Sequence, residues 1–324
     1  MKICFIGAGA LGSALGGTLA FHGLDVTLID HNQAHVDKIN SNGLNLKEGD
    51  EIRKVKIKAA ASTQGLPVMD LIIVLVKSFG TKKAIQDALP MIGAHTLVMS
   101  LQNGLGNEEA IMEVVGSERV IGGKTYAGGV FQEPGEVIAG TINKLTVIGE
   151  MDGRVTERIK NLAEILTAHG LMTQISDNIV GMIWDKLLIN AATGAVSALT
   201  RLPYGGLYNV REVKDVALEA VAEGIAVAKA KGVEISVEDP AAIWYKAAAG
   251  LPYRFKASML QSIEAGKATE VDFINGQILY HGERLGIQTP VNKTLVAMVK
   301  GYEYWMMNFS GKVIPDQPVD WPRL

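Results

Sequence analysis

Cysteine is nearly absent from this chain. Among 324 residues there is one, Cys4, which lies inside the first apolar run. A single thiol excludes an internal disulfide, so the sequence favours a reducing compartment. Because Cys4 is expected in a buried strand, it is not a candidate nucleophile. The six histidines are dispersed without ligand spacing, so no metal site is predicted.

Extreme charge and membrane-spanning apolar runs are also missing. The chain has 31 Lys and Arg against 34 Asp and Glu, for a formal net charge of −3, and the basic residues are scattered. This pattern argues against a nucleic-acid or anionic-membrane partner. Polar residues interrupt every long apolar stretch, and the N-terminus lacks a small-residue cleavage site. We therefore expect a soluble, cytoplasmic protein.

The length exceeds what one core usually spans, so two domains are expected. The first half alternates helical patterns with apolar runs at residues 2–6, 26–29, 71–76 and 97–101. That alternation predicts a parallel sheet covered on both faces. Residues 120–149 have the glycine and proline turns of hairpins or edge strands.

From residue 156 onward the apolar spacing is helical. Helices are expected over 156–169, 177–199 and 269–285, with a further one around the stripe Val213, Val216, Ala220 and Ile225. The predicted fold class is α/β: a Rossmann-type dinucleotide-binding domain over residues 1–170 and an all-helical domain over 171–324. The tail with Pro315, Pro318 and Pro322 is expected to be irregular.

The N-terminal stretch GAGALG has the spacing G-x-G-x-x-G between a predicted strand and a predicted helix. Gly7 permits the tight turn, Gly9 lets the backbone approach a pyrophosphate, and Gly12 lets helix and strand pack closely. The pyrophosphate would rest on the helix N-terminus, beside Ala10 and Leu11. The context of strand, helix and following acid favours a dinucleotide site over a plain glycine-rich turn.

The acid is Asp30, at the end of the second predicted strand. A carboxylate there accepts hydrogen bonds from a ribose 2′-hydroxyl and repels a 2′-phosphate, which favours NAD over NADP. The alternative is that Asp30 caps the next turn. His31 and Lys38 could still supply some positive charge for NADP.

Polar residues interrupt the apolar helix predicted over 177–199. Lys186 and Asn190 lie four residues apart and therefore on one face. A buried ammonium is costly unless paired, and burial pulls a lysine pKa toward the range useful for proton transfer. Alternatively, Lys186 reaches the surface or pairs with Asp185. Glu270, expected in the first turn of a helix capped by Thr269, could merely complement the helix dipole.

Together these segments make the chain resemble the ketopantoate reductase (2-dehydropantoate 2-reductase) family over essentially its whole length. The matching segments are GAGALG, VLVKS, LQNGLG, WDKLLIN and SMLQ followed by TEVDFING, and they carry Lys77, Asn103, Lys186, Asn190, Ser258 and Glu270. The resemblance implies a Rossmann domain followed by a helical domain of the 6-phosphogluconate-dehydrogenase-like type, with the site in the cleft between. It also implies hydride transfer from a nicotinamide cofactor to a 2-keto acid.

The resemblance further implies roles for these residues. Lys186 is the general acid that protonates the developing alkoxide, and Glu270 holds the substrate and helps place the lysine. Asn190 and Ser258 hydrogen-bond the substrate. Asn103 and Lys77 lie near the nicotinamide and its ribose and are assigned to cofactor binding. Asn103 is also assigned to substrate binding.

Two positions depart from the family pattern. Gly194 replaces an asparagine one turn after Asn190, which removes a substrate contact and leaves room for another 2-keto acid. The second strand ends in Asp30-His31 where NADPH-dependent members carry arginine, which again favours NAD. An opine-type dehydrogenase and a non-catalytic dinucleotide sensor stay open as alternatives, and the alanine-rich helical half suggests a homodimer.

Overall fold

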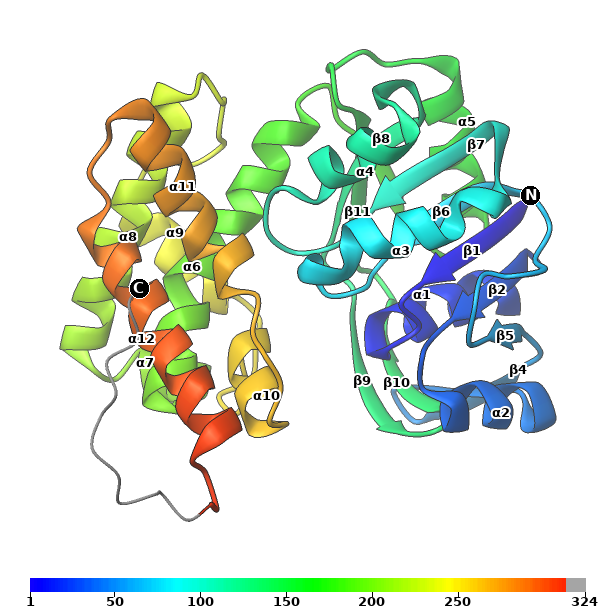
Figure 1. The fold of residues 1–324 in the computed structure, drawn as a ribbon, viewed down its shortest axis with the longest axis horizontal. Helices are drawn as coiled ribbons and strands as arrows, with labels where there is room; N and C mark the ends of the chain where they lie inside the picture. The colour runs from blue at the N-terminus through cyan, green and yellow to red at the C-terminus, as the bar shows by residue number, and fades with distance from the viewer. Residues whose placement is uncertain (313–324) are drawn as a thin grey trace. The chain divides into compact units, whose positions relative to one another are not determined.

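The structure is a computed structural model that describes residues 1–312, so the predicted irregular tail with Pro315, Pro318 and Pro322 lies outside the described residues. Its contacts divide the chain into two units (Figure 1). The first unit comprises residues 1–187 and 228–237, and the second comprises residues 188–227 and those from 238 onward.

Strand β1 shows how the main sheet of the first unit buries both of its faces. Ile3 and Phe5 belong to one apolar cluster, which includes helices α1 and α5, while Cys4 and Ile6 belong to another, which includes α3 and α4. Successive strand side chains point to opposite faces, so such an apolar run requires helices on both sides. The predicted doubly covered sheet is confirmed. The helices of this unit are α1 (Ala10–Phe21), α2 (Gln33–Asn42), α3 (Thr81–Ala88), α4 (Asn107–Val115) and α5 (Glu157–Ala168), with short 3₁₀ turns η1 (Ser78–Gly80), η2 (Leu89–Met91) and η3 (Ser117–Arg119).

The main sheet has eight strands in the order β12-β11-β8-β7-β6-β1-β2-β5. All neighbouring pairs are parallel except β8 with β11. The carboxyl ends of β2, β1, β6, β7 and β8 therefore share one edge. The strands are β1 (Lys2–Ile6), β2 (Asp25–Ile29), β5 (Lys58–Ala60), β6 (Met69–Val74), β7 (Ile92–Ser100), β8 (Val120–Thr125), β11 (Thr146–Glu150) and β12 (Thr173–Ile175).

A second sheet was not predicted. It has four strands in the order β4-β3-β10-β9, namely β4 (Glu51–Val55), β3 (Leu44–Glu48), β10 (Glu136–Gly140) and β9 (Gly128–Glu133). Leu44 and Leu46 pack against Gly17 of α1, where an added Cβ would lie 2.8 Å from Leu44 Cδ2. Within this second sheet, the β9–β10 hairpin lies in the stretch 120–149 where strands were expected, and β8 and β11 of the main sheet lie in the same stretch.

Helix α6 (Ile179–Thr200) begins against a flat spot on the main sheet. Gly122 of β8 pairs with Gly149 of β11, and a Cβ on either glycine would approach Ile179 within 3.1 Å or less. The two missing side chains thus let the start of α6 lie directly on the strands. Three residues further along α6, Met182 contacts Lys124 of β8.

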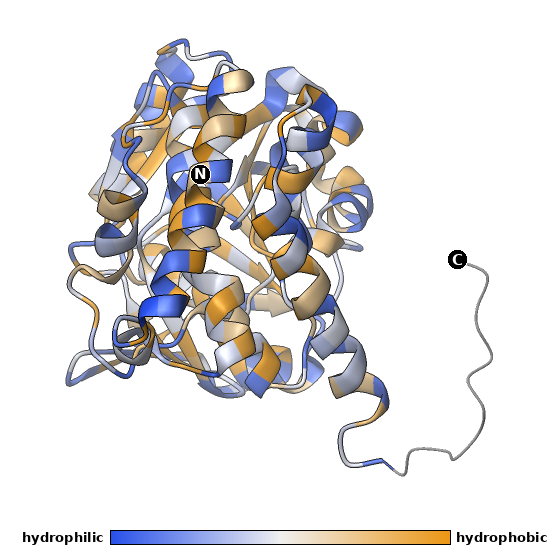
Figure 2. Cartoon of the chain, turned by 90° about the vertical axis from the view of Figure 1, so that its left-hand side faces the viewer, coloured by the Kyte–Doolittle hydropathy of each residue, from blue (hydrophilic) through white to orange (hydrophobic). Residues whose placement is uncertain are grey.

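The second unit is helical, as predicted. Figure 2 shows hydrophilic and hydrophobic residues alternating along its helices, as expected where one stripe faces a core. Buried Asn292 links three of them: its amide donates to Ala220 O and to Glu223 Oε2, and its Oδ1 accepts from Asn275 at 2.9 Å. The helices are α7 (Tyr204–Leu207), α8 (Arg211–Ala230), α9 (Pro240–Ala248), α10 (Ser258–Glu264), α11 (Asn275–Leu285) and α12 (Pro290–Asn308), with the 3₁₀ turn η4 (Val271–Phe273).

The division between the units falls inside α6, between Leu187 and Leu188, whereas the sequence placed the domain boundary at residues 170–171. Within the described residues, α6 is the helix long and apolar enough to cross a membrane. However, 72% of its most apolar window is buried inside the protein, which is the pattern of a core helix.

The prediction of one continuous helix from residue 269 was wrong. The backbone leaves helical geometry at Ile274 (φ −114°, ψ −91°), which separates η4 from α11. Glu270 precedes η4 and is therefore not in the first turn of an α-helix. Thr269 does cap locally, since its hydroxyl accepts from Val271 N at 3.2 Å.

Candidate active site

The glycine turn after β1 has the shape of a pyrophosphate cradle. Gly7 has φ +99°, and a Cβ there would lie 2.5 Å from Val76 N. A Cβ on Gly12 would lie 2.2 Å from Gly7 O. At Gly9, in contrast, a Cβ would meet nothing within 4 Å. Gly7 and Gly12 are thus needed by the protein's own packing, while Gly9 leaves space beside the start of α1, where Ala10 and Leu11 follow. The turn therefore fits a dinucleotide.

Asp30 lies at the end of β2, next to β1. Its Oδ1 accepts from Asn32 N at 2.9 Å, and Asn32 in turn caps α2 by accepting from His35 N. The local capping role considered for Asp30 is therefore real. It is compatible with ribose binding, because a carboxylate has several acceptor positions.

Lys77 and Asn103 follow β6 and β7 at the same sheet edge. The backbone carbonyl of Asn103 accepts from Ser78 Oγ at 3.1 Å and from Asn107 Nδ2 at 3.0 Å. Thr81 Oγ1 donates to Asn107 Oδ1 at 3.0 Å. Buried hydroxyl and amide groups therefore fix the backbone that carries Asn103.

Glu108 extends this buried region and is 3% exposed in the first turn of α4. Burial raises its pKa from 4.5 to about 7, partly offset by hydrogen bonds from its own backbone N–H and from Ser100. Between these values the folded state holds the proton that the unfolded state releases. The free energy of unfolding should therefore fall as pH rises from 4.5 to about 7.

Glu108→Gln, which stays neutral, should consequently melt at the wild-type temperature near pH 4.5 and several degrees higher at pH 8. Thermal unfolding at the two pH values measures this difference. Glu164→Gln changes an exposed acid on α5 of the same unit, away from Glu108, and should leave both melting temperatures unchanged. Equal melting of Glu108→Gln and wild type at pH 8 would contradict the assignment.

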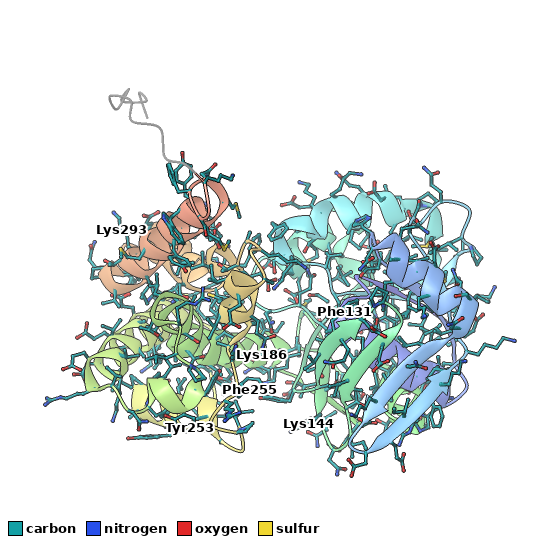
Figure 3. All side chains as sticks on the ribbon, turned by 90° about the horizontal axis from the view of Figure 1, so that it is seen from below. Phe131, Lys144, Lys186, Tyr253, Phe255 and Lys293 are labelled. Atoms are coloured by element: carbon teal, nitrogen blue, oxygen red, sulfur yellow. The ribbon has the colours of Figure 1, made fainter. Side chains whose placement is uncertain are left out.

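Lys186 reaches the same sheet edge from α6 (labelled in Figure 3). Its side chain is half-buried rather than fully buried, and Nζ donates to Thr125 O at 2.9 Å. Asp185, considered above as its partner, accepts from Ser236 N at 2.9 Å. Lys186 Nζ thus lies at the carboxyl end of β8, on the edge that carries the glycine turn, Lys77 and Asn103.

Sequence reasoning missed a second lysine at this place. Lys124 of β8 is 2% exposed, and its Nζ lies 3.9 Å from Met182 Sδ. Met182 and Lys186 are four residues apart on α6 and share a face. A lysine inside the otherwise uncharged run VIGGKT was the available signal.

In the second unit, Asn190 lies on α6 and is half-buried, and Ser258 is the exposed first residue of α10. Glu270 is 5% exposed just before η4. Thr269 N donates to Glu303 Oε1 of α12 at 2.7 Å, which ties the Glu270 segment to that helix.

The expected free space at Gly194 is not present. A Cβ on Gly194 would lie 3.1 Å from Met259 Cε and 3.2 Å from its Sδ. Met259 is buried on α10, next to Ser258. A thioether therefore fills the place where the family pattern has an asparagine side chain, so the change makes this part of the second unit more apolar without opening room.

Three features define a Rossmann-type protein that uses a nicotinamide dinucleotide. They are the strand order of the main sheet, the glycine cradle after β1 and the carboxylate of Asp30 after β2. The family described as "Ketopantoate reductase PanE/ApbA" matches residues 3–153, and its C-terminal part matches residues 178–303. The 2-dehydropantoate 2-reductase of Pyrococcus horikoshii is 37% identical over 303 residues, which cover 94% of this chain and 98% of the relative. The chain belongs to the ketopantoate reductase family, a family of NAD(P)-dependent 2-keto acid reductases.

Solved structures agree with this assignment. The PanE/ApbA family ketopantoate reductase of Ralstonia eutropha JMP134 has a TM-score of 0.87 at 34% identity and covers 95% of this chain and 100% of its own. D-mandelate dehydrogenase with NADH and anilino(oxo)acetate has a TM-score of 0.88 at 27% identity, covering 94% and 99%. The family fold therefore hosts more than one keto-acid specificity.

Proposed function

We propose that this protein reduces a 2-keto acid to the 2-hydroxy acid with NADH, and that ketopantoate is its substrate. The observation that carries the proposal is the position of Lys186 Nζ, 2.9 Å from Thr125 O at the sheet edge that also carries the glycine cradle and Asn103. The cofactor, when bound, supplies the hydride that C2 of the substrate accepts.

The chain's own groups supply the remaining steps. The Lys186 ammonium donates a proton to the keto oxygen as negative charge develops there, which completes the hydroxyl group. Asn190, one turn further along α6, and Ser258 hydrogen-bond the substrate, and Glu270 holds the substrate and orients the lysine. Lys77 and Asn103 position the nicotinamide end. In this proposal residues 1–170 bind the dinucleotide and residues 171–324 serve substrate binding and dimerisation.

Asp30 supports NADH over NADPH, because its carboxylate would repel a 2′-phosphate. The ratio of kcat/KM for NADH to that for NADPH should exceed one, and Asp30→Ala should lower it about tenfold, which corresponds to about 1.4 kcal/mol. Steady-state kinetics with both cofactors measures the ratio. Asp37→Ala, on the exposed face of α2, is the matched control and should leave the ratio unchanged. A wild-type preference for NADPH would overturn this assignment.

A second candidate substrate is a 2-keto acid with an apolar or aromatic substituent. Met259 packed on Gly194 supports it, as does the similarity to D-mandelate dehydrogenase. Initial rates with ketopantoate, branched 2-keto acids and phenylglyoxylate separate the two candidates. Faster turnover of ketopantoate supports the first, and faster turnover of phenylglyoxylate supports the second. Amine-dependent oxidation of NADH would instead indicate an opine-type reaction.

The proposal also places the enzyme in the cytoplasm as a homodimer. The lone buried cysteine supports a reducing compartment, and α12 of the second unit exposes Met298, Tyr304 and Trp305, which supply apolar surface for association. Light scattering on the purified protein would give the mass of the assembly, and the mass of one chain would contradict the dimer.

A further inference from the structure

The buried lysine on β8 lacks an anionic partner in the described part of the chain. Every residue of β8 is buried, and Lys124 itself is 2% exposed. Its Nζ contacts the Met182 thioether and lies 5.1 Å from the centre of the Tyr126 ring. A thioether and an aromatic face are weak partners for an ammonium, and neither neutralises its charge.

A charge in this position is costly for the fold. Buried lysines are normally paired with a carboxylate, because burial removes the hydration that stabilises the ammonium. An uncharged residue of similar volume would pack against Met182 and Tyr126 without that cost. The ammonium at position 124 is therefore suited to an anion that comes from outside the chain.

The register of the sheet shows where such an anion would bind. Val98 and Met99 of β7 pair with Val120 and Ile121 of β8. A Cβ on Gly123 would lie 2.7 Å from Leu101 Cδ2, so β8 and the segment that follows β7 stay adjacent beyond the end of β7. Lys124 thus lies beside the segment that leads into Asn103.

Lys186 is held next to Lys124 along β8. Its Nζ bonds to the carbonyl of Thr125, the next residue of β8, and Met182, which contacts Lys124, is one turn before Lys186 on α6. Two ammonium groups, one from β8 and one from α6, are therefore supplied at one end of one strand.

We propose that Lys124 binds the carboxylate of the 2-keto acid while Lys186 serves the keto oxygen. The inference rests on the proposed function and adds to it the group that recognises the acid. A 2-keto acid carries its carboxylate and its keto oxygen on adjacent carbons, which matches two neighbouring ammonium groups. Lys124 contributes the compact charge of an ammonium group, whereas an arginine would form two parallel hydrogen bonds to the carboxylate.

The test compares a charged substrate with its uncharged counterpart. Wild type, Lys124→Gln and Lys124→Arg are assayed with NADH on the faster of ketopantoate and phenylglyoxylate, and on its methyl ester. Lys124→Gln should lower kcat/KM for the acid roughly tenfold to a hundredfold, mainly through KM, because a hydrogen bond to a charged group is lost. The value of kcat/KM for the ester should change little in Lys124→Gln. Lys124→Arg should recover part of the loss of kcat/KM for the acid.

Lys144→Gln is the matched control, since Lys144 is an exposed lysine of the same unit (labelled in Figure 3), and it should behave as wild type. An equal loss on acid and ester would overturn the proposal and would mean that Lys124 acts on Lys186 rather than on the carboxylate. An unchanged acid rate in Lys124→Gln would overturn it as well.

A binding measurement keeps this test separate from the proposed reaction. Oxalate, titrated calorimetrically into protein saturated with NADH, should bind wild type and Lys144→Gln, and bind Lys124→Gln at least about tenfold more weakly. Without oxalate, Lys124→Met should have a higher melting temperature than wild type. Adding oxalate should raise the melting temperature of Lys124→Met by less than it raises that of wild type. Weaker oxalate binding by Lys124→Gln would support the anion site even if no 2-keto acid were reduced. Equal oxalate binding by all variants would overturn it.

Discussion

Replacing Lys186 by methionine should lower kcat for the best 2-keto acid by at least about a hundredfold, because the variant lacks the proton donor for the keto oxygen. Binding of NADH should change little, since the glycine cradle and Asp30 follow strands β1 and β2 and do not depend on this side chain. Steady-state rates and fluorescence titration of NADH measure the two effects separately.

The controls for this variant concern stability and charge. Lys186 Nζ bonds to Thr125 O, so Lys186→Met should also lower the melting temperature modestly through the lost hydrogen bond. Lys144→Met removes an exposed lysine of the same unit and should change neither rate nor melting temperature. If Lys186→Met retained the wild-type kcat at its own pH optimum, Lys186 would not be the general acid.

Two alanine substitutions in the glycine turn should separate cofactor binding from stability. Gly9→Ala adds a methyl group that meets no protein atom within 4 Å, so the protein should melt as wild type does. NADH should nevertheless bind at least about tenfold more weakly, because the added carbon keeps the backbone away from the pyrophosphate. Gly12→Ala places a methyl group 2.2 Å from Gly7 O and should destabilise the fold by about 1–3 kcal/mol.

Thermal unfolding with and without NADH measures both variants in one experiment. Wild type should gain stability with NADH, and Gly9→Ala should lose most of that gain at a fixed NADH concentration. Unchanged NADH binding by Gly9→Ala would mean that the cradle does not hold the cofactor.

The main sheet could be predicted because its strands are unambiguous in the sequence. Runs such as KICFI and LIIVLV are apolar on both faces, and only a doubly covered strand buries both. The second sheet could not be predicted in the same way. Its β4 segment, EIRKV, is mostly polar and lies at a sheet edge. It therefore shows no strong alternation of apolar and polar residues, which is the usual sequence signal of a strand. The role of β3 depends on Gly17 of α1, a distant residue that sequence periodicity does not connect to it.

The candidate site was partly predictable for a similar reason. Gly7, Gly9, Gly12 and Asp30 form a motif with a fixed spacing, so local sequence was sufficient to find them. Lys124 belongs to no spacing pattern, and its importance depends on the packing of β8 against α6. The break at Ile274, which takes Glu270 out of an α-helix, is likewise a backbone feature that apolar periodicity does not show.

The most direct test of the central claim follows the hydride itself. Stereospecifically deuterated NADH, labelled in turn at each C4 position, is incubated with wild-type protein and with ketopantoate or phenylglyoxylate, and the product is analysed by mass spectrometry. The account predicts a 2-hydroxy acid that carries one deuterium at C2 with one of the two labelled forms, and no such product with Lys186→Met on the same timescale. Tight NADH binding without a deuterated 2-hydroxy acid from any 2-keto acid would contradict the account and would support a dinucleotide sensor.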